Sequence, residues 1–98
     1  MWLTDFLEQQ IVEKLDGDKS RFPELFRDED IFDQLIELGK NNHGFYFESN
    51  TFDGEYLIKT ERGYTTYSQD HGRRGFHSDF PDLQSAAIFF FSREIERL

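Results

Sequence analysis

Residues Glu55 to Phe80 read EYLIKTERGYTTYSQDHGRRGFHSDF, and this stretch decides the fold. Runs rich in β-branched and aromatic residues lie at 55–60, 64–68 and 73–80. Short turn sequences separate them, Glu61-Arg62-Gly63 in one case and Asp70-His71-Gly72 in the other. Parallel strands need a crossover of about a dozen residues or more, so links this short predict an antiparallel meander.

A further strand is predicted before the meander. Phe45 and Phe47 alternate with Tyr46 and Glu48, which is the period of a half-buried strand, and we expect the strand to continue toward Thr51. Residues 50–54 then supply turn formers. The sheet should therefore be an antiparallel meander of about four strands.

Two helices are predicted ahead of the sheet. In the first, Thr4 caps a helix that begins at Asp5 and ends before Asp16-Gly17-Asp18, with an apolar stripe at Leu3, Phe6, Leu7, Ile11 and Leu15. A polar connection over 16–29 follows, in which Pro23 can open a short turn. The second helix has Asp28 or Asp30 as its cap and buries Ile31, Phe32, Leu35, Ile36 and Leu38. We expect Gly39 to end it in a left-handed conformation.

A last helix is predicted after Phe80-Pro81, with Asp82 or Asp79 at its N-terminus. Its apolar face contains Leu83, Ala86, Ala87, Phe90, Phe91, Ile95 and Leu98. The small alanines allow this helix to approach the sheet closely. The predicted fold class is α+β: two N-terminal helices, the meander, and a C-terminal helix packed on the sheet.

Length and composition limit what the protein can be. A chain of 98 residues forms one domain, 1–98. It has no cysteine, which excludes disulfides and thiolate metal sites. The longest apolar run, residues 86–91, is far shorter than the roughly 20 residues of a membrane span. With no secretory signal visible at Met1, we expect a cytoplasmic protein that binds no membrane.

The charge is strongly acidic and unevenly distributed. The net charge is −9. Residues 1–38 contain eleven acidic and four basic side chains, so this segment holds most of the negative charge. Such a field repels nucleic acid, so we expect no nucleic-acid partner. The excess sits chiefly on Asp16, Asp18, Glu24, Asp28, Glu29, Asp30, Asp33 and Glu37. It indicates either a solvated acidic surface or a patch for a basic partner.

Motifs for catalysis or metal binding are not found. Asp16-Gly17-Asp18 begins like a calcium loop, but Arg21 and Arg27 stand where that loop needs glycine and an acid. His43, His71 and His77 lack the helical spacing of zinc proteases. No phosphate-binding glycine loop or nucleophile elbow occurs. We therefore predict no catalytic residues, no cofactor and no metal.

One stretch resembles a known group of proteins. Residues 61–72, ERGYTTYSQDHG, continue through Phe76 and Phe80 to the helix that begins near Asp82. This order is similar to the C-terminal half of small bacterial immunity proteins of polymorphic-toxin and contact-dependent growth inhibition systems. The resemblance covers residues 55–95 and departs from the family pattern at Asp70-His71-Gly72, where an acid-Arg-Gly turn is usual. It implies a protein that neutralises a toxin, without assigning any residue a role.

The sequence thus predicts an immunity protein that is not an enzyme. It would bind the basic C-terminal domain of a cognate toxin, with a nuclease expected, and occlude its active site. The predicted partner-binding residues are Asp28, Asp30, Asp33 and Glu37 on the second helix, with Asp16 and Asp18 beside it. Tyr64, Tyr67 and Asp70 on the sheet form an alternative surface, since tyrosine is frequent at interface hot spots. The alternatives are a small acidic adaptor for another basic protein and, third, a small enzyme.

Overall fold

The chain folds into four helices and a four-stranded mixed sheet, which confirms the α+β class. The computed structural model describes residues 1–98. Its helices are α1 (Leu3–Leu15), the 3-10 helix η1 (Lys19–Phe26), α2 (Asp30–Gly39) and α3 (Leu83–Glu96). Its strands are β1 (Phe45–Tyr46), β2 (Gly54–Thr60), β3 (Gly63–Asp70) and β4 (Arg73–Phe80). None of the helices has the length and apolar character to cross a bilayer.

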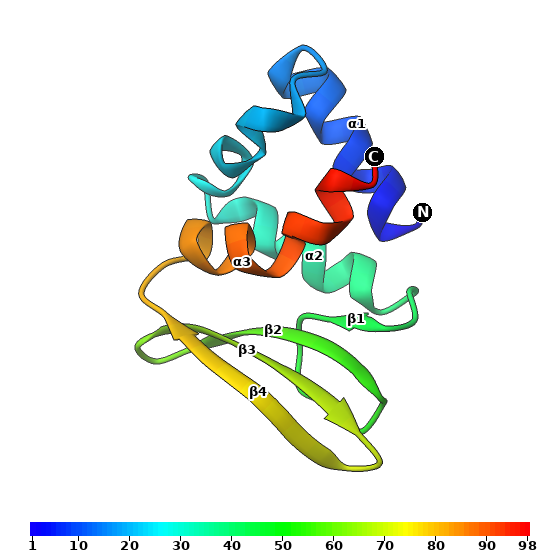
Figure 1. Cartoon of the computed structure of the whole chain (residues 1–98), viewed down its shortest axis with the longest axis vertical. Helices are drawn as coiled ribbons and strands as arrows, with labels where there is room; N and C mark the ends of the chain where they lie inside the picture. The colour runs from blue at the N-terminus through cyan, green and yellow to red at the C-terminus, as the bar shows by residue number, and fades with distance from the viewer.

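The helices all lie on one side of the sheet. Figure 1 shows α2 and α3 next to the sheet, with α1 and η1 beyond them at the far end of the molecule. The core lies between and among these helices and joins them to the sheet through Phe47, Leu57 and Tyr64. Phe26 of η1 stacks on Phe91 of α3 with ring centres 5.4 Å apart, which connects the outer helices to the inner ones.

The predicted apolar face of α1 is confirmed, and that of α3 is confirmed except for Phe90, which is partly buried, and Leu98, which lies beyond the helix. All five residues of the α1 stripe are buried, and α3 buries Leu83, Ala86, Ala87, Phe91 and Ile95. Asp82 caps α3 as predicted, because its carboxylate accepts a hydrogen bond from the Ser85 amide at 2.8 Å. Periodic apolar spacing identifies these helices well because each has one long buried face.

Several helix ends differ from the prediction. α1 begins at Leu3 rather than at Asp5, and its first amide is capped by the side chain of Asn42 instead of Thr4. Gly39 is the last residue of α2 and is not left-handed; a Cβ there would lie 3.1 Å from the Phe47 ring, so the glycine permits close packing. The polar connection is mostly the 3-10 helix η1, with Pro23 inside it and Asp18 as its cap. Tertiary contacts decide these ends, and local sequence does not reveal them.

The sheet is not a pure antiparallel meander. Strands β2, β3 and β4 pair antiparallel as predicted, but β1 pairs parallel with β2, in the order β1-β2-β3-β4. Only Phe45 and Tyr46 form β1, so the expected extension toward Thr51 is wrong. Residues 47–53 leave the strand and fold back, and the Asn50 and Phe52 carbonyl oxygens accept hydrogen bonds from Nε2 of the Gln69 side chain. A two-residue strand needs no long crossover to be parallel.

The face of the sheet that points away from the helices carries a row of tyrosines. Tyr56 stacks on Tyr67 at 4.8 Å and lies 5.1 Å from Tyr46. The Tyr56 hydroxyl donates a hydrogen bond to the Phe52 carbonyl, and His77 stacks on Tyr67. All three tyrosines are at least nine-tenths buried. The row is therefore a small second core rather than an exposed platform.

Candidate functional site

A cleft rich in carboxylates separates α2 from the adjoining end of the sheet. Its volume is about 480 Å³. Glu29, Asp30 and Asp33 come from the start of α2 and the residue before it, and Glu48 comes from the segment after β1. Lys59 of β2 is the one basic residue among its lining side chains. We call this the acidic cleft.

The fold gives the acidic cleft an aromatic floor. Phe32 packs its ring edge-on against Tyr64 at 5.2 Å and against Phe47 at 6.2 Å. All three rings are buried, and they come from α2, β3 and the segment after β1. Phe32 belongs to the buried row of α2, so Asp30 and Asp33 emerge from the same turns of helix on its exposed side. The carboxylates are thus held above a rigid apolar base.

Tyr64 places a hydroxyl group beside the Glu29 carboxylate at this floor. The residue is 3% exposed, and its hydroxyl has no partner at good hydrogen-bond geometry. Burial raises the pKa of Tyr64 above its ordinary value, and the nearby carboxylates of Glu29 and Asp33 raise it further. The hydroxyl stays protonated and can donate or accept a hydrogen bond.

The ion pairing inside the acidic cleft is weak. The Lys59 ammonium lies 3.9 Å from the Glu29 carboxylate, and both side chains are more than half exposed. No salt bridge involves Asp30, Asp33 or Glu48. These carboxylates therefore keep their charges available for a cationic group from outside.

The predicted partner-binding residues divide into separate places. Asp30, Asp33 and Tyr64, which the sequence assigned to two alternative surfaces, meet in the acidic cleft. Glu37 lies further along α2 and pairs with Lys40 at 2.8 Å. Asp28 accepts a hydrogen bond from the Asp30 amide at 3.0 Å, so its carboxylate helps to start the helix.

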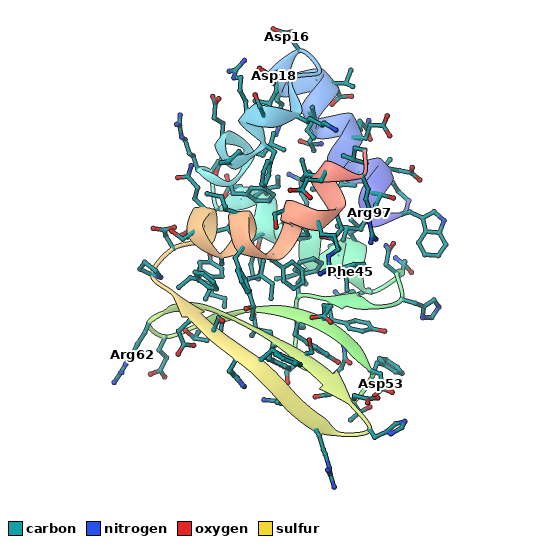
Figure 2. The ribbon with its side chains drawn as sticks, in the orientation of Figure 1. Asp16, Asp18, Phe45, Asp53, Arg62 and Arg97 are labelled. Atoms are coloured by element: carbon teal, nitrogen blue, oxygen red, sulfur yellow. The ribbon has the colours of Figure 1, made fainter.

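Asp16 and Asp18 do not lie beside α2. Figure 2 shows both at the tip of the helical half, at the far end from the sheet. Asp18 is occupied there by the Ser20 amide and hydroxyl, and these hydrogen bonds lower the pKa of its carboxyl group. The early acidic residues are thus spread over the helical half, and only part of them forms one cleft.

Tyr64, Tyr67 and Asp70 do not form one surface. Side chains alternate between the faces of a strand, so residues three apart in β3 point to opposite sides. Tyr64 faces the helices, whereas Tyr67 belongs to the tyrosine row on the other face. Asp70 is exposed at the β3–β4 turn.

The sequence did not single out Glu29 and Glu48 as site residues. Glu29 stands in the acidic run Asp28-Glu29-Asp30, which is a signal for it. Glu48 has no such signal, because the return of the chain after β1 brings it to the cleft.

Asp53, Asp70 and His71 form a second group of polar side chains. Their ligand atoms all lie within 4.8 Å of one another, and all three residues are exposed. The Asp53 carboxylate accepts a hydrogen bond from the His71 amide at 2.9 Å. This contact stabilises the β3–β4 turn and accounts for the position of Asp53.

No family model, curated protein or solved structure matches the chain. The acidic cleft and the charge distribution are therefore the features on which we base a proposal about its function.

Proposed function

We propose that the chain is an immunity protein that binds a basic toxin domain through the acidic cleft. The observation that carries this proposal is the set of unpaired carboxylates of Asp30, Asp33 and Glu48 above a buried aromatic floor. A lysine or arginine of the partner would enter the cleft and meet these carboxylates and the Tyr64 hydroxyl. Charge-assisted hydrogen bonds of this kind are about twice as strong as neutral ones.

The net charge supports the same mode of recognition. A protein of charge −9 attracts a basic partner over a distance of about one Debye length, roughly 8 Å at physiological salt. Inhibition would follow from covering the basic surface on which a nuclease toxin holds its substrate. No bond is made or broken in this mechanism, so the protein acts as an inhibitor rather than an enzyme.

Three carboxyl groups outside the acidic cleft have a structural role. Hydrogen bonds from Ser20, Arg21 and Ser85 lower the pKa values of Asp18, Glu24 and Asp82 respectively. A general acid needs a shift in the opposite direction. These three groups therefore serve as charged structural contacts.

Co-expression tests the proposal. A toxin gene is expected directly upstream of the gene for this chain. The chain is produced together with the C-terminal domain of that toxin, and growth and co-purification are measured. Rescue of growth by a co-purifying complex is expected. A toxic domain that neither binds the chain nor is neutralised by it would overturn the immunity function.

A charge-reversal pair tests the cleft itself. Asp30→Lys combined with Asp33→Lys should slow association by roughly tenfold or more and flatten its dependence on salt. The matched control is Glu8→Lys with Glu13→Lys, which changes the net charge equally on exposed positions of α1. Equal effects of the two pairs would show that overall charge, and not the cleft, governs binding.

The acidic adaptor is the second candidate, because the cleft would accept a basic side chain from any protein. It is favoured if the complex forms with a basic partner that is not toxic. Toxicity of the partner alone therefore distinguishes the two functions.

A further inference from the structure

A second cleft opens between α3 and the sheet, and it shares no lining residue with the acidic cleft. Its volume is about 450 Å³, within the range of about 300–1,000 Å³ that is usual for ligand sites. Figure 2 shows the region of its Phe45 wall, where the C-terminal part of α3 rises away from the sheet. We call it the aromatic cleft.

Phenylalanines form its walls. Phe45 and Phe90 pack edge-on at 6.1 Å, and Phe89 is 58% exposed on α3. Phe76 of β4 is 90% exposed, which is unusual for so large an apolar side chain. A polar residue is better suited to so exposed a position, so the phenylalanine at position 76 needs another explanation.

The backbone at Phe76 holds that ring out from the strand. The pairing of β3 with β4 shifts register between Thr66 and Ser68, which marks a β-bulge in the edge strand. Phe76 has a φ of +56° there, in the left-handed region that bulky side chains rarely occupy. Bulges of this kind often redirect a side chain next to a functional site.

Polar groups without partners lie at the base of the aromatic cleft. Thr66 pairs across the strands with the core residue Leu57, so its side chain faces the helices and the cleft. Thr66 is only 3% exposed, and its hydroxyl makes no hydrogen bond. One carboxylate oxygen of Glu94, Oε2, is also buried without a partner. Buried polar atoms are normally hydrogen-bonded, so the Glu94 oxygen is free to accept a hydrogen bond and the Thr66 hydroxyl is free to accept or donate one.

A second carboxylate lies fixed at the same cleft. Glu55 accepts a hydrogen bond from the Ser68 hydroxyl at 2.6 Å. The cleft's own cation, Arg93, forms no salt bridge with Glu55 or Glu94. The lining thus combines two carboxylates that have no cationic partner with several aromatic faces.

We propose that the aromatic cleft binds an arginine side chain of a partner protein. A planar guanidinium donates several hydrogen bonds in fixed directions, which suits Glu94 and Thr66 together. It also stacks on aromatic rings, so Phe76 and Phe89 would cover its faces and its aliphatic stem. A lysine offers neither the planar shape nor the stacking. This inference rests on the aromatic cleft alone and is independent of the proposed function.

Spectroscopic titration tests this site. The isotope-labelled chain is titrated with Nα-acetyl-arginine methylamide, and the NMR chemical shifts of its backbone amides are followed. Saturable shifts are expected at Thr66, Ser68 and Glu94. The lysine analogue should bind more weakly, and the citrulline analogue, which has the same shape without the charge, should give no saturable shift. Equal binding of all three compounds, or shifts confined to the acidic cleft, would overturn the proposal.

Two variants assign the effect to the cleft. Glu94→Gln should weaken binding by roughly tenfold, because the charged hydrogen bond is lost. Phe76→Ala should also weaken it, and the ring is too exposed for its loss to unfold the chain. The matched controls are Phe52→Ala, an exposed aromatic residue on the other face, and Asp33→Asn in the acidic cleft. Unchanged binding by Glu94→Gln and Phe76→Ala in well-dispersed spectra would refute the site and leave the proposed function intact.

Discussion

The side-chain oxygen of Asn42 accepts a hydrogen bond from the backbone amide of Leu3 at 3.0 Å, across thirty-nine positions of sequence. The Asn42 amide group donates in turn to the Met1 carbonyl at 3.0 Å and to the Leu38 carbonyl at 2.7 Å. One buried side chain therefore caps the start of α1 and binds the end of α2.

Replacing Asn42 by alanine should destabilise the fold by about 1–3 kcal/mol, because it leaves the Leu3 amide without its buried partner and removes the hydrogen bonds to the Met1 and Leu38 carbonyls. Urea unfolding followed by circular dichroism measures the effect, which should appear as a lower midpoint with an unchanged slope. Asn41→Ala is the matched control, since Asn41 is exposed. Equal midpoints for the two variants would contradict the capping role.

Gly63 is required by the turn between β2 and β3. Its φ is +145°, and a Cβ at this position would lie 2.3 Å from the Phe80 carbonyl oxygen. Gly63→Ala should therefore cost about 2 kcal/mol or more, because backbone must move. Thermal unfolding measures the loss. Gly75→Ala meets no atom within 4 Å and has no positive φ, so it should leave the melting temperature almost unchanged; a similar loss there would point to a general intolerance of the sheet.

Much of the fold could be predicted because its long elements have simple periods. The buried stripes of α1 and α3 repeat at helical spacing, and β2 to β4 are joined by short turns that allow only antiparallel pairing. The direction of β1 could not be predicted in the same way. It depends on the hydrogen bonds that the Gln69 side chain makes to the returning segment, 17 and 19 positions away in the sequence.

The candidate site could be predicted only in part. The charge pattern identified Asp30 and Asp33, but it could not separate them from Asp16 and Asp18, which the fold carries to the opposite end (Figure 2). The charge pattern along the sequence does not show which carboxylates lie on the same side of the folded molecule. The aromatic cleft was missed because its parts come from β1, β2, β3, β4 and α3 and adjoin only after folding.

The Asp82 cap of α3 should make the free energy of unfolding depend on pH at acidic values. Hydrogen bonds from Ser85 lower the pKa of Asp82 below its ordinary value of 3.8. Its contribution is therefore complete above that value and is lost as the pH falls through the lower, folded-state pKa. Asp82→Ala should be less stable than the wild type at about pH 6, and the difference should narrow below about pH 4. Urea midpoints at both conditions measure this, and a constant difference would show that the charge of Asp82 contributes nothing.

The Tyr64 hydroxyl distinguishes a binding role from a structural one. It is buried without a partner, so Tyr64→Phe should be as stable as the wild type or more stable by up to about 1 kcal/mol. The ring still packs on Phe32, and only the polar atom is removed. If the acidic cleft receives a basic side chain, the same variant should bind the partner more weakly, since one hydrogen-bonding group of the floor is gone.

Tyr67→Phe is the matched control for this change. Its hydroxyl is also buried without a partner, but it lies on the opposite face of the sheet. It should therefore keep both stability and partner affinity. Urea midpoints and titration calorimetry with the co-purifying partner measure the two properties for each variant. A destabilised Tyr64→Phe would mean that the hydroxyl is used within the fold, whereas equal affinities for both variants would remove Tyr64 from the interface.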